Sequence, residues 1–148
     1  FIPMTEHHPI IGQSPYSASK IGADQLCMSF YNSFSLPVTI LRPFNTFGPR
    51  QSGRAIIPTI ISQHITESKF LRLGSLSPTR DFNYIEDTVV AFVKCIKAKN
   101  IEGEVINIGS GKEFSIKHIV LGDPRGYWKI IYLEPEKSRL FSKKILIM

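Results

Sequence analysis

The spacing of apolar residues predicts a long helix near the start of the sequence, preceded by a loop. Residues 1–13 contain two prolines and a glycine, which interrupt any regular period. Ser14 and Pro15 then form a helix start, with serine at the N-cap and proline at the first helical position. Apolar residues at helical spacing continue this helix to about Ser33, although Gly22 weakens it.

Short apolar strands and further helices alternate through the middle of the chain. Strands are predicted at 37–42 (PVTILR), 70–74 (FLRLG) and 104–109 (EVINIG), with helices at 55–65 and 87–97. Asp87 begins the last of these helices and Lys97 ends it, as the helix dipole favours. The segments 43–54 and 75–80 are predicted to be a loop and a turn. Strands that alternate with helices predict an α/β layered fold with parallel strands.

The end of the chain shows no such alternation. Residues 121–148 have no stable period, and Gly122 and Pro124 interrupt the amphipathic pattern that precedes them. A chain of 148 residues has the size of a single domain with a real core. We therefore expect one partial α/β domain over 1–118 and a divergent tail over 119–148, for which the pattern predicts no structure.

The composition is that of a globular protein without a charged arm. Hydrophobic residues make up 43% and charged residues 20%, and the net charge of +6 is spread along the chain. The lack of a basic block argues against nucleic-acid binding and is compatible with a small anionic ligand. No apolar run is long enough to cross a bilayer and no signal peptide opens the sequence. We therefore expect no membrane contact and a cytoplasmic location.

The cysteines and the paired histidines predict no special chemistry. Cys27 and Cys95 lie in apolar, helix-like stretches, so buried free thiols in a reducing compartment are favoured over a disulfide. His7 and His8 are adjacent and have no cysteine or carboxylate partner at a useful spacing. We therefore expect loop histidines and no metal site.

Tyr16 and Lys20 are the residues with the strongest catalytic signal. Residues four apart on a helix lie on one face, so the ammonium of Lys20 can act on the phenol of Tyr16. A nearby ammonium stabilises the phenolate form, which suits a tyrosine that transfers protons near neutral pH. This spacing also arises by chance, and by itself it fits a pair on a helix surface equally well.

Four stretches together give the pair a context. They are SPYSASK (14–20), RPFNTFGPR (42–50), TRDFNYIEDTV (79–89) and EVINIGSGKEFSI (104–116). In this order and spacing, from about residue 3 to residue 118, they resemble the extended short-chain dehydrogenase/reductase family, the NAD-dependent epimerases and dehydratases of nucleotide sugars. The sequences of these four stretches are most similar to those of the 4,6-dehydratases of nucleotide-activated N-acetylhexosamines, as in legionaminic acid biosynthesis.

The resemblance implies a fold, partners and a reaction. The fold would be the C-terminal part of a Rossmann-like doubly wound parallel sheet, plus part of a small substrate-binding subdomain. The partners would be NAD, a nucleotide sugar used in polysaccharide biosynthesis and, in the intact enzyme, a second copy in a homodimer. In the implied reaction Tyr16, as phenolate, takes the proton of the sugar C4 hydroxyl while hydride passes to NAD. Acidic residues then eliminate water across C5 and C6, and hydride returns to C6.

The resemblance also assigns residues to the cofactor. Tyr16 would be the catalytic acid/base, and Lys20 would stabilise its phenolate and donate a hydrogen bond to the nicotinamide ribose. Pro43, Phe44 and Thr46 follow a predicted strand, where open α/β sheets bind ligands. They would lie beside the nicotinamide.

A second set of residues would hold the nucleotide sugar. Asn45 and Arg80 would bind the diphosphate, and a planar guanidinium suits that ligand. Asn107 would contact the nucleotide end, and the nucleotide pocket would be lined by Arg54, Ile56 and Pro58. Simple turn chemistry remains an alternative for Asn45, and for Asn107 the alternative is a strand-end side chain that caps its own backbone.

Parts of the family pattern have no counterpart in the sequence. It contains no G-x-x-G-x-x-G loop, on which the family's NAD pyrophosphate rests, and no counterpart of the acidic pair that eliminates water. We therefore expect the chain to correspond to the second half of a larger enzyme. Nucleotide-sugar C4 epimerisation, a non-catalytic nucleotide-sugar binder and an inactive remnant stay open as alternatives to the 4,6-dehydratase.

Overall fold

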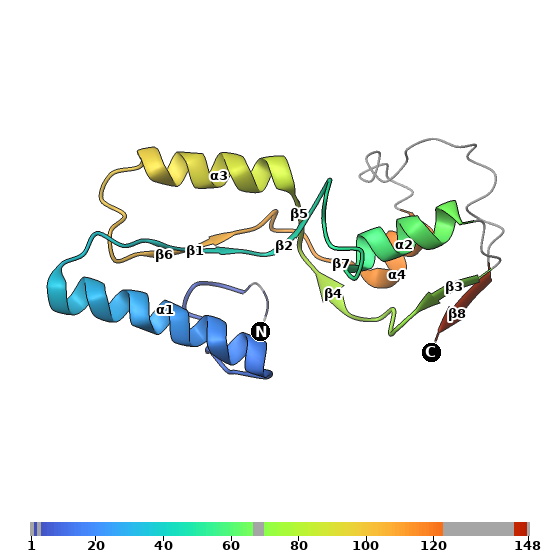
Figure 1. Cartoon of the computed structure of the whole chain (residues 1–148), viewed down its shortest axis with the longest axis horizontal. Helices are drawn as coiled ribbons and strands as arrows, with labels where there is room; N and C mark the ends of the chain where they lie inside the picture. Colours follow the sequence, from blue (N-terminus) through green and yellow to red (C-terminus); the bar gives the residue numbers. More distant parts are fainter. Residues whose placement is uncertain (1, 3, 67–69, 123–143, 148) are drawn as a thin grey trace. The chain divides into compact units, whose positions relative to one another are not determined.

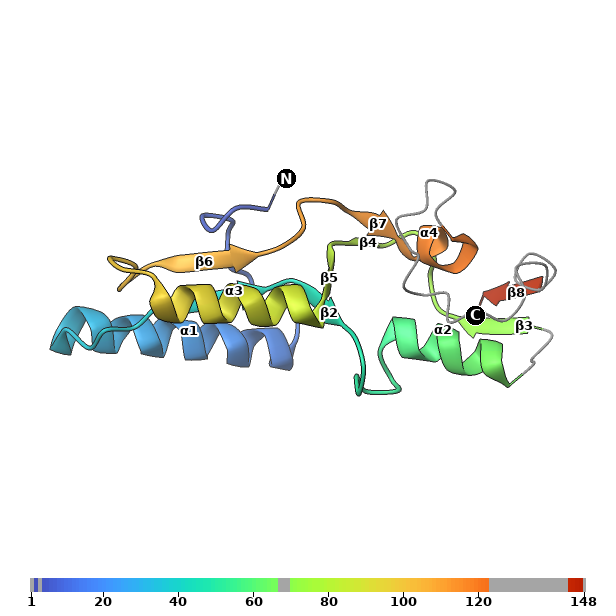
Figure 2. The same cartoon turned by 90° about the horizontal axis from the view of Figure 1, so that it is seen from above.

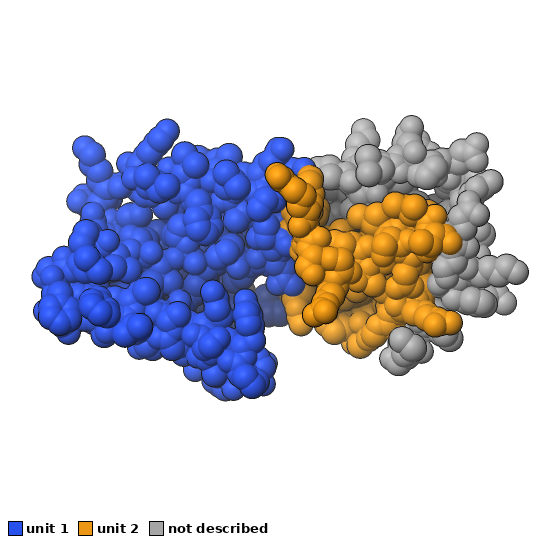
Figure 3. Space-filling view, viewed as in Figure 1, with its two compact units in different colours: residues 1–46, 83–111 blue, residues 47–82, 112–148 orange. Residues whose placement is uncertain are grey.

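The chain divides into two compact units in the computed structural model. The structure describes residues 2, 4–66, 70–122 and 144–147. Unit 1 consists of residues 1–46 and 83–111, and unit 2 consists of residues 47–82 and 112–148 (Figure 3).

Unit 1 is built around a pair of parallel strands. Its elements are α1 (Pro15–Phe34), β1 (Ile40–Pro43), α3 (Ile85–Lys97) and β6 (Val105–Ile108). Strand β1 pairs with β6 in a register that runs from Ile40 opposite Val105 to Pro43 opposite Ile108. Helices α1 and α3 lie on opposite faces of this pair (Figures 1 and 2). This arrangement confirms the predicted α/β class with parallel strands.

Few side chains of unit 1 are buried. Ile40 is buried on β1 and Thr88 on α3, whereas α1 has no buried residue. Apolar side chains of both helices are largely exposed, among them Leu26, Phe30, Val89, Phe92 and Ile96. Cys27 lies on α1 and is exposed, so its predicted burial is wrong. Cys95 on α3 is half-buried, and both thiols are free, as predicted.

Unit 2 has a denser core. Its helices are α2 (Ile56–Ile65) and α4 (Ile116–Leu121), and its strands are β3 (Phe70–Leu73), β4 (Thr79–Arg80), β7 (Phe114–Ser115) and β8 (Lys144–Ile147). Strand β3 pairs in parallel with β8, and β4 pairs antiparallel with β7. The buried apolar side chains include Ile57, Ile60, Leu71, Leu73, Phe114, Ile116 and Ile119.

The helices α1, α2 and α3 and the four-residue strands β1, β3 and β6 overlap the predicted elements, whereas strands of two or three residues were not predicted. Strand β2 (Asn45–Phe47) lies inside the predicted loop and pairs with β5 (Phe82–Tyr84), and the division into units runs through both strands. Strand β4 lies in the predicted turn. Two or three residues are too few to show a period of two. Helix α3 begins two residues before the predicted start.

The chain after α4 is only partly described. Helix α4 ends at Leu121, and Gly122 follows with a φ of 76°, as the predicted helix break requires. Residues 123–143 of the predicted tail lie outside the described residues, and the expected domain boundary at residue 118 stays a prediction. No helix in the described part of the chain is both long enough and apolar enough to span a membrane.

Candidate active site

The first turn of α1 is fixed by a reciprocal cap. The backbone N–H of Ser17 donates to Ser14 Oγ at 3.1 Å, and the backbone N–H of Ser14 donates to Ser17 Oγ at 2.8 Å. Together with Pro15 at the first helical position, this capping box satisfies donors that a helix end otherwise leaves open. Tyr16 is therefore held in a well-defined first turn, as the sequence predicts.

Tyr16 and Lys20 are available to a ligand. Both lie on α1 one turn apart, hence on one face. Tyr16 is 74% exposed, and Lys20 is exposed as well. No other residue in the described ranges binds the Tyr16 hydroxyl or the Lys20 ammonium. The surface of α1 therefore presents a phenol and an ammonium, and no described residue competes with a ligand for either group.

The predicted cofactor residues follow β1 at its carboxyl end. The Phe44 N–H donates to the carbonyl of Ile108 at 2.9 Å, which extends the pairing of β1 with β6 by one bond. Pro43 and Asn45 are exposed, whereas Phe44 and Thr46 are half-buried. Side chains therefore alternate between an accessible and a packed side at the place where open α/β sheets bind ligands.

Thr46 is tied to α3 through a buried threonine. The Thr46 and Thr88 hydroxyls lie 3.3 Å apart, and Thr46 Oγ1 is also 3.3 Å from the carbonyl oxygen of Phe44. Thr88 is 6% exposed, and its hydroxyl donates to the carbonyl of Tyr84 at 3.4 Å. These contacts fix the backbone after β1 against the first turn of α3. The sequence alone did not single out Thr88.

Asn107 is engaged by the N-terminal loop. Its backbone N–H donates to Glu6 Oε1 at 2.9 Å, and its side-chain Nδ2 donates to the carbonyl of Met4 at 3.3 Å. The expected alternative, an amide that caps its own backbone, is therefore not what the structure shows. The bond from the Asn107 N–H is the main cause that lowers the pKa of Glu6. The charges of His7 and Arg42 act in the same direction, and partial burial opposes them.

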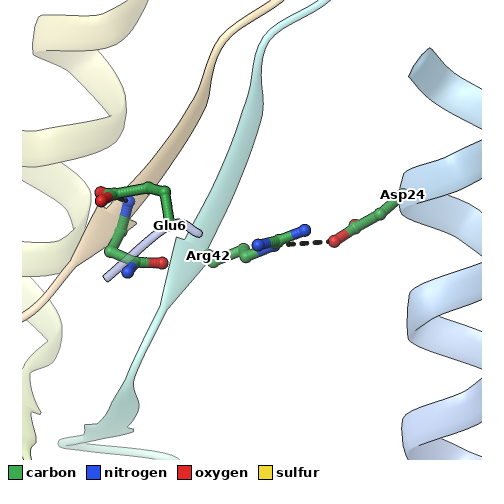
Figure 4. Close-up of polar contacts among 4 residues, drawn as sticks. Glu6, Asp24 and Arg42 are labelled. Carbon is green, nitrogen blue, oxygen red and sulfur yellow. Dashed lines mark hydrogen bonds and ion pairs between the residues drawn. The ribbon is translucent and has the colours of Figure 1, made fainter. Parts of the chain in front are cut away.

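An ion pair joins α1 to β1 at mid-helix. Arg42 Nε donates to Asp24 Oδ2 at 2.8 Å, and the guanidinium reaches from the strand to the helix (Figure 4). Asp24 lies four residues after Lys20, on the same face of α1. The carboxylate of Asp24 is thus bound to Arg42. The sequence did not predict this ion pair, because only folding brings residues 18 positions apart into contact.

The remaining predicted substrate residues lie in unit 2. Arg54 is exposed, and its backbone N–H donates to Ser52 Oγ at 3.4 Å. Ile56 and Pro58 are half-buried in the first turn of α2. Arg80 is exposed on β4, and its Nη1 donates to the carbonyl of Thr79 at 2.7 Å. A pocket shared by these residues and Tyr16 stays a prediction.

Metal-ligating residues do not gather in the part of the chain that the structure describes. No group of three or more histidine, cysteine, aspartate or glutamate side chains there could hold a metal ion. Among the predicted site residues of unit 1, Tyr16, Lys20 and Asn45 instead expose a phenol, an ammonium and an amide. These groups suit proton transfer and hydrogen bonding to an organic ligand.

Several proteins to which this chain is similar in sequence and fold are named as nucleotide-sugar enzymes. The dTDP-D-glucose 4,6-dehydratase of Dictyostelium discoideum is 43% identical over 69% of this chain and 23% of its own length. The crystal structure of UDP-glucuronic acid 4-epimerase from Bacillus cereus, in complex with UDP-glucuronic acid and NAD, matches with a TM-score of 0.74 and 36% identity. That match covers 79% of this chain and 38% of the epimerase.

The dTDP-glucose 4,6-dehydratase of Bacillus anthracis, solved with NAD, is 27% identical and has a TM-score of 0.75, over 98% of this chain and 43% of the dehydratase. The chain thus spans only part of its curated relatives, from 23% to 37% of the length of four of them. The family described as GDP-mannose 4,6 dehydratase matches residues 1–126. The chain therefore belongs to this family of NAD-dependent nucleotide-sugar epimerases and dehydratases.

Proposed function

We propose that this chain carries the proton-transfer helix and part of the substrate site of an NAD-dependent nucleotide-sugar 4,6-dehydratase. The observation that supports this most directly is the position and exposure of Tyr16 and Lys20. Both lie on one face of a capped helix and are exposed, and no other described residue binds the hydroxyl or the ammonium. The match to dTDP-D-glucose 4,6-dehydratases favours this reaction.

The proposed roles follow from the chemistry of each group. Tyr16, as phenolate, accepts the proton of the sugar hydroxyl at C4, and the positive charge of Lys20 stabilises the phenolate. Asn45, exposed at the end of β1, donates its amide hydrogens to the diphosphate. Arg80 offers a guanidinium to the same group. Arg54, Ile56, Pro58 and Asn107 contribute to the nucleotide pocket.

The residues present fit one end of a dinucleotide. NAD, when bound, supplies a hydride acceptor for the sugar C4. Lys20 would donate a hydrogen bond to the nicotinamide ribose, and the phenol of Tyr16 would lie at the same end. Pro43, Phe44 and Thr46 would line the nicotinamide side. The 148 residues contain no glycine-rich loop for the pyrophosphate, so we expect this chain to bind the cofactor weakly.

Mass spectrometry of the product tests the proposed reaction. The 148-residue chain is incubated with NAD and, in separate reactions, with dTDP-glucose, UDP-glucose and UDP-N-acetylglucosamine. A dehydratase converts the nucleotide sugar to a product lighter by one water. If no nucleotide sugar is converted and neither NAD nor any of these sugars changes the unfolding temperature, the proposal that this chain carries part of such a site is overturned, while its family membership stands.

Substitution of the tyrosine assigns its role. We expect Tyr16→Phe to reduce turnover by about 10²- to 10⁴-fold, while affinity for the nucleotide sugar changes by less than about threefold. Lys20→Met should also reduce turnover, because it removes the charge that stabilises the phenolate. Lys94→Met on α3, which is exposed and far along the sequence from the pair, is its control. A loss of affinity with turnover preserved would contradict the assigned role of Tyr16.

A second candidate is C4 epimerisation, because a UDP-glucuronic acid 4-epimerase matches this chain at 36% identity with a TM-score of 0.74. The same Tyr16 and Lys20 would serve, and no water would be lost. A product of unchanged mass that separates from the substrate by chromatography would favour the epimerase and exclude the dehydratase.

A further inference from the structure

The outer edge of β6 carries a backbone donor that β1 cannot use. The Ile40 N–H donates to the carbonyl of Glu104, and the Phe44 N–H donates to the carbonyl of Ile108, so this side of β6 faces β1. Successive backbone groups of a strand point to opposite edges. Asn107 precedes Ile108, and its N–H therefore points away from β1. Among the described strands, β6 pairs with β1 alone.

The N-terminal loop occupies this edge at two points. Glu6 Oε1 accepts the Asn107 N–H at 2.9 Å, and the carbonyl of Met4 accepts Asn107 Nδ2 at 3.3 Å. Glu6 lies in a turn that is closed by the bond from the His8 N–H to the carbonyl of Thr5 at 3.0 Å. Figure 2 shows the N-terminal segment beside β6, on the side away from β1. A carboxylate that accepts a backbone N–H forms a strong, charge-assisted bond.

The other end of the same loop rests on the first turn of α1. A Cβ added to Gly12 would lie 3.1 Å from the Cβ of Ala18, so the backbone there contacts the helix between Tyr16 and Lys20. Two residues after Gly12, Ser14 begins the capping box. Residues 4–14 are therefore attached to β6 at one end and to the Tyr16 turn at the other.

The surroundings of Glu6 favour its ionised form. The Asn107 N–H lowers the pKa of the Glu6 carboxyl most, followed by the backbone N–H of Glu6 itself, and the charges of His7 and Arg42 lower it less. Arg42 is itself bound to Asp24 on α1 (Figure 4). The positive charge of one strand residue thus acts on the loop carboxylate and on the helix carboxylate.

We propose that Glu6 is a positioning residue, which holds the Tyr16–Lys20 turn of α1 in place by fixing the loop 4–14 to the open edge of β6. The consequence for proton transfer rests on the proposed function. The attachment of the loop does not, because it depends only on contacts within this chain.

Hydrogen exchange of single amides tests the attachment in the 148-residue chain without any nucleotide. We expect the Asn107 amide proton to be protected in the unaltered protein and to exchange at least about tenfold faster in Glu6→Ala. Glu6→Gln keeps an acceptor oxygen and should fall between the two. The amides of Ile40 and Phe44, which bind β6 carbonyls, should be unaffected. Glu102→Gln, an exposed carboxylate in unit 1, is the matched control.

A pH titration tests the positioning. As Glu6 is protonated, the NMR shifts of the Asn107 and Ala18 amides should follow one curve at acid pH. The pH-dependent changes of both amide shifts should vanish in Glu6→Gln and persist in His7→Gln. An Asn107 amide that exchanges as fast as in an unstructured peptide overturns the attachment. If Asn107 titrates while Ala18 does not, the positioning role is overturned. Failure to bind NAD or to convert a nucleotide sugar counts against the proposed function alone.

Discussion

Arg42 on β1 and Asp24 on α1 form an ion pair in which Arg42 Nε lies 2.8 Å from Asp24 Oδ2. The two side chains are 26% and 25% exposed, so water screens the pair only in part. The pair fixes α1 along β1, and it binds the carboxylate that lies one turn after Lys20. The position of the Tyr16–Lys20 face relative to the end of β1 therefore depends on this contact.

A double-mutant cycle measures the ion pair. Asp24→Ala and Arg42→Ala should each lower the free energy of unfolding, and their coupling energy should be about 1 kcal/mol, because the pair is charged and partly buried. Urea unfolding of the four proteins gives the coupling. Glu102→Ala combined with Lys94→Ala, both exposed, should show no coupling. A coupling energy indistinguishable from zero for Asp24 and Arg42 would contradict the anchoring role.

Gly103 is predicted to tolerate no side chain. Its φ is +81°, and an added Cβ would collide with the ring of Tyr31 on α1, including an approach of 2.9 Å to Oη. Its N–H also donates to the carbonyl of Val38 at 2.7 Å, which fixes this backbone. We expect Gly103→Ala to lower the free energy of unfolding by about 2 kcal/mol or more, from backbone strain and the clash together.

Two further variants separate these causes. Gly53→Ala, where nothing lies within 4 Å of the added Cβ, should change stability by less than about 0.5 kcal/mol. Adding Tyr31→Ala to Gly103→Ala removes the clash but not the strain, so the two effects should be less than additive. Full additivity would show that the ring of Tyr31 does not rest on Gly103.

The cap of α1 should contribute measurably to stability. Ser14→Ala removes the acceptor of the Ser17 N–H, and we expect a loss of about 1 kcal/mol with a lower helix signal in circular dichroism. Ser29→Ala is the control, because Ser29 lies within the helix and its hydroxyl only bonds back to the carbonyl of Leu26. An equal effect of the two substitutions would argue against the cap.

Stability should depend on acid pH through Glu6. Its pKa is lowered in the folded chain from a reference value of 4.5, chiefly by the Asn107 N–H. Because the folded state binds the proton less well, the stabilisation is fully present above the unfolded-state value and is lost as pH falls through the lowered one. Thermal unfolding between neutral and acid pH should therefore show a steeper decline for the unaltered protein than for Glu6→Gln. Parallel profiles would refute this contribution.

The local sequence predicts the elements that need no distant partner. Ser14 and Pro15 mark the start of α1, and the spacing of Tyr16 and Lys20 places them on one face whatever the rest of the chain does. The apolar runs predict β1 and β6 as parallel strands, and the structure pairs them. Four motifs in order also point to the family that matches residues 1–126.

Only the tertiary structure decides which residues hold those elements together. The contacts of Arg42 with Asp24, Thr46 with Thr88 and Asn107 with Glu6 join residues 18, 42 and 101 positions apart. No periodicity connects such residues, because their contact depends on how helices and strands pack. The tertiary structure also decides which side chains are buried. Cys27 has an apolar neighbourhood in sequence, yet it is exposed because α1 has no buried residue in this chain.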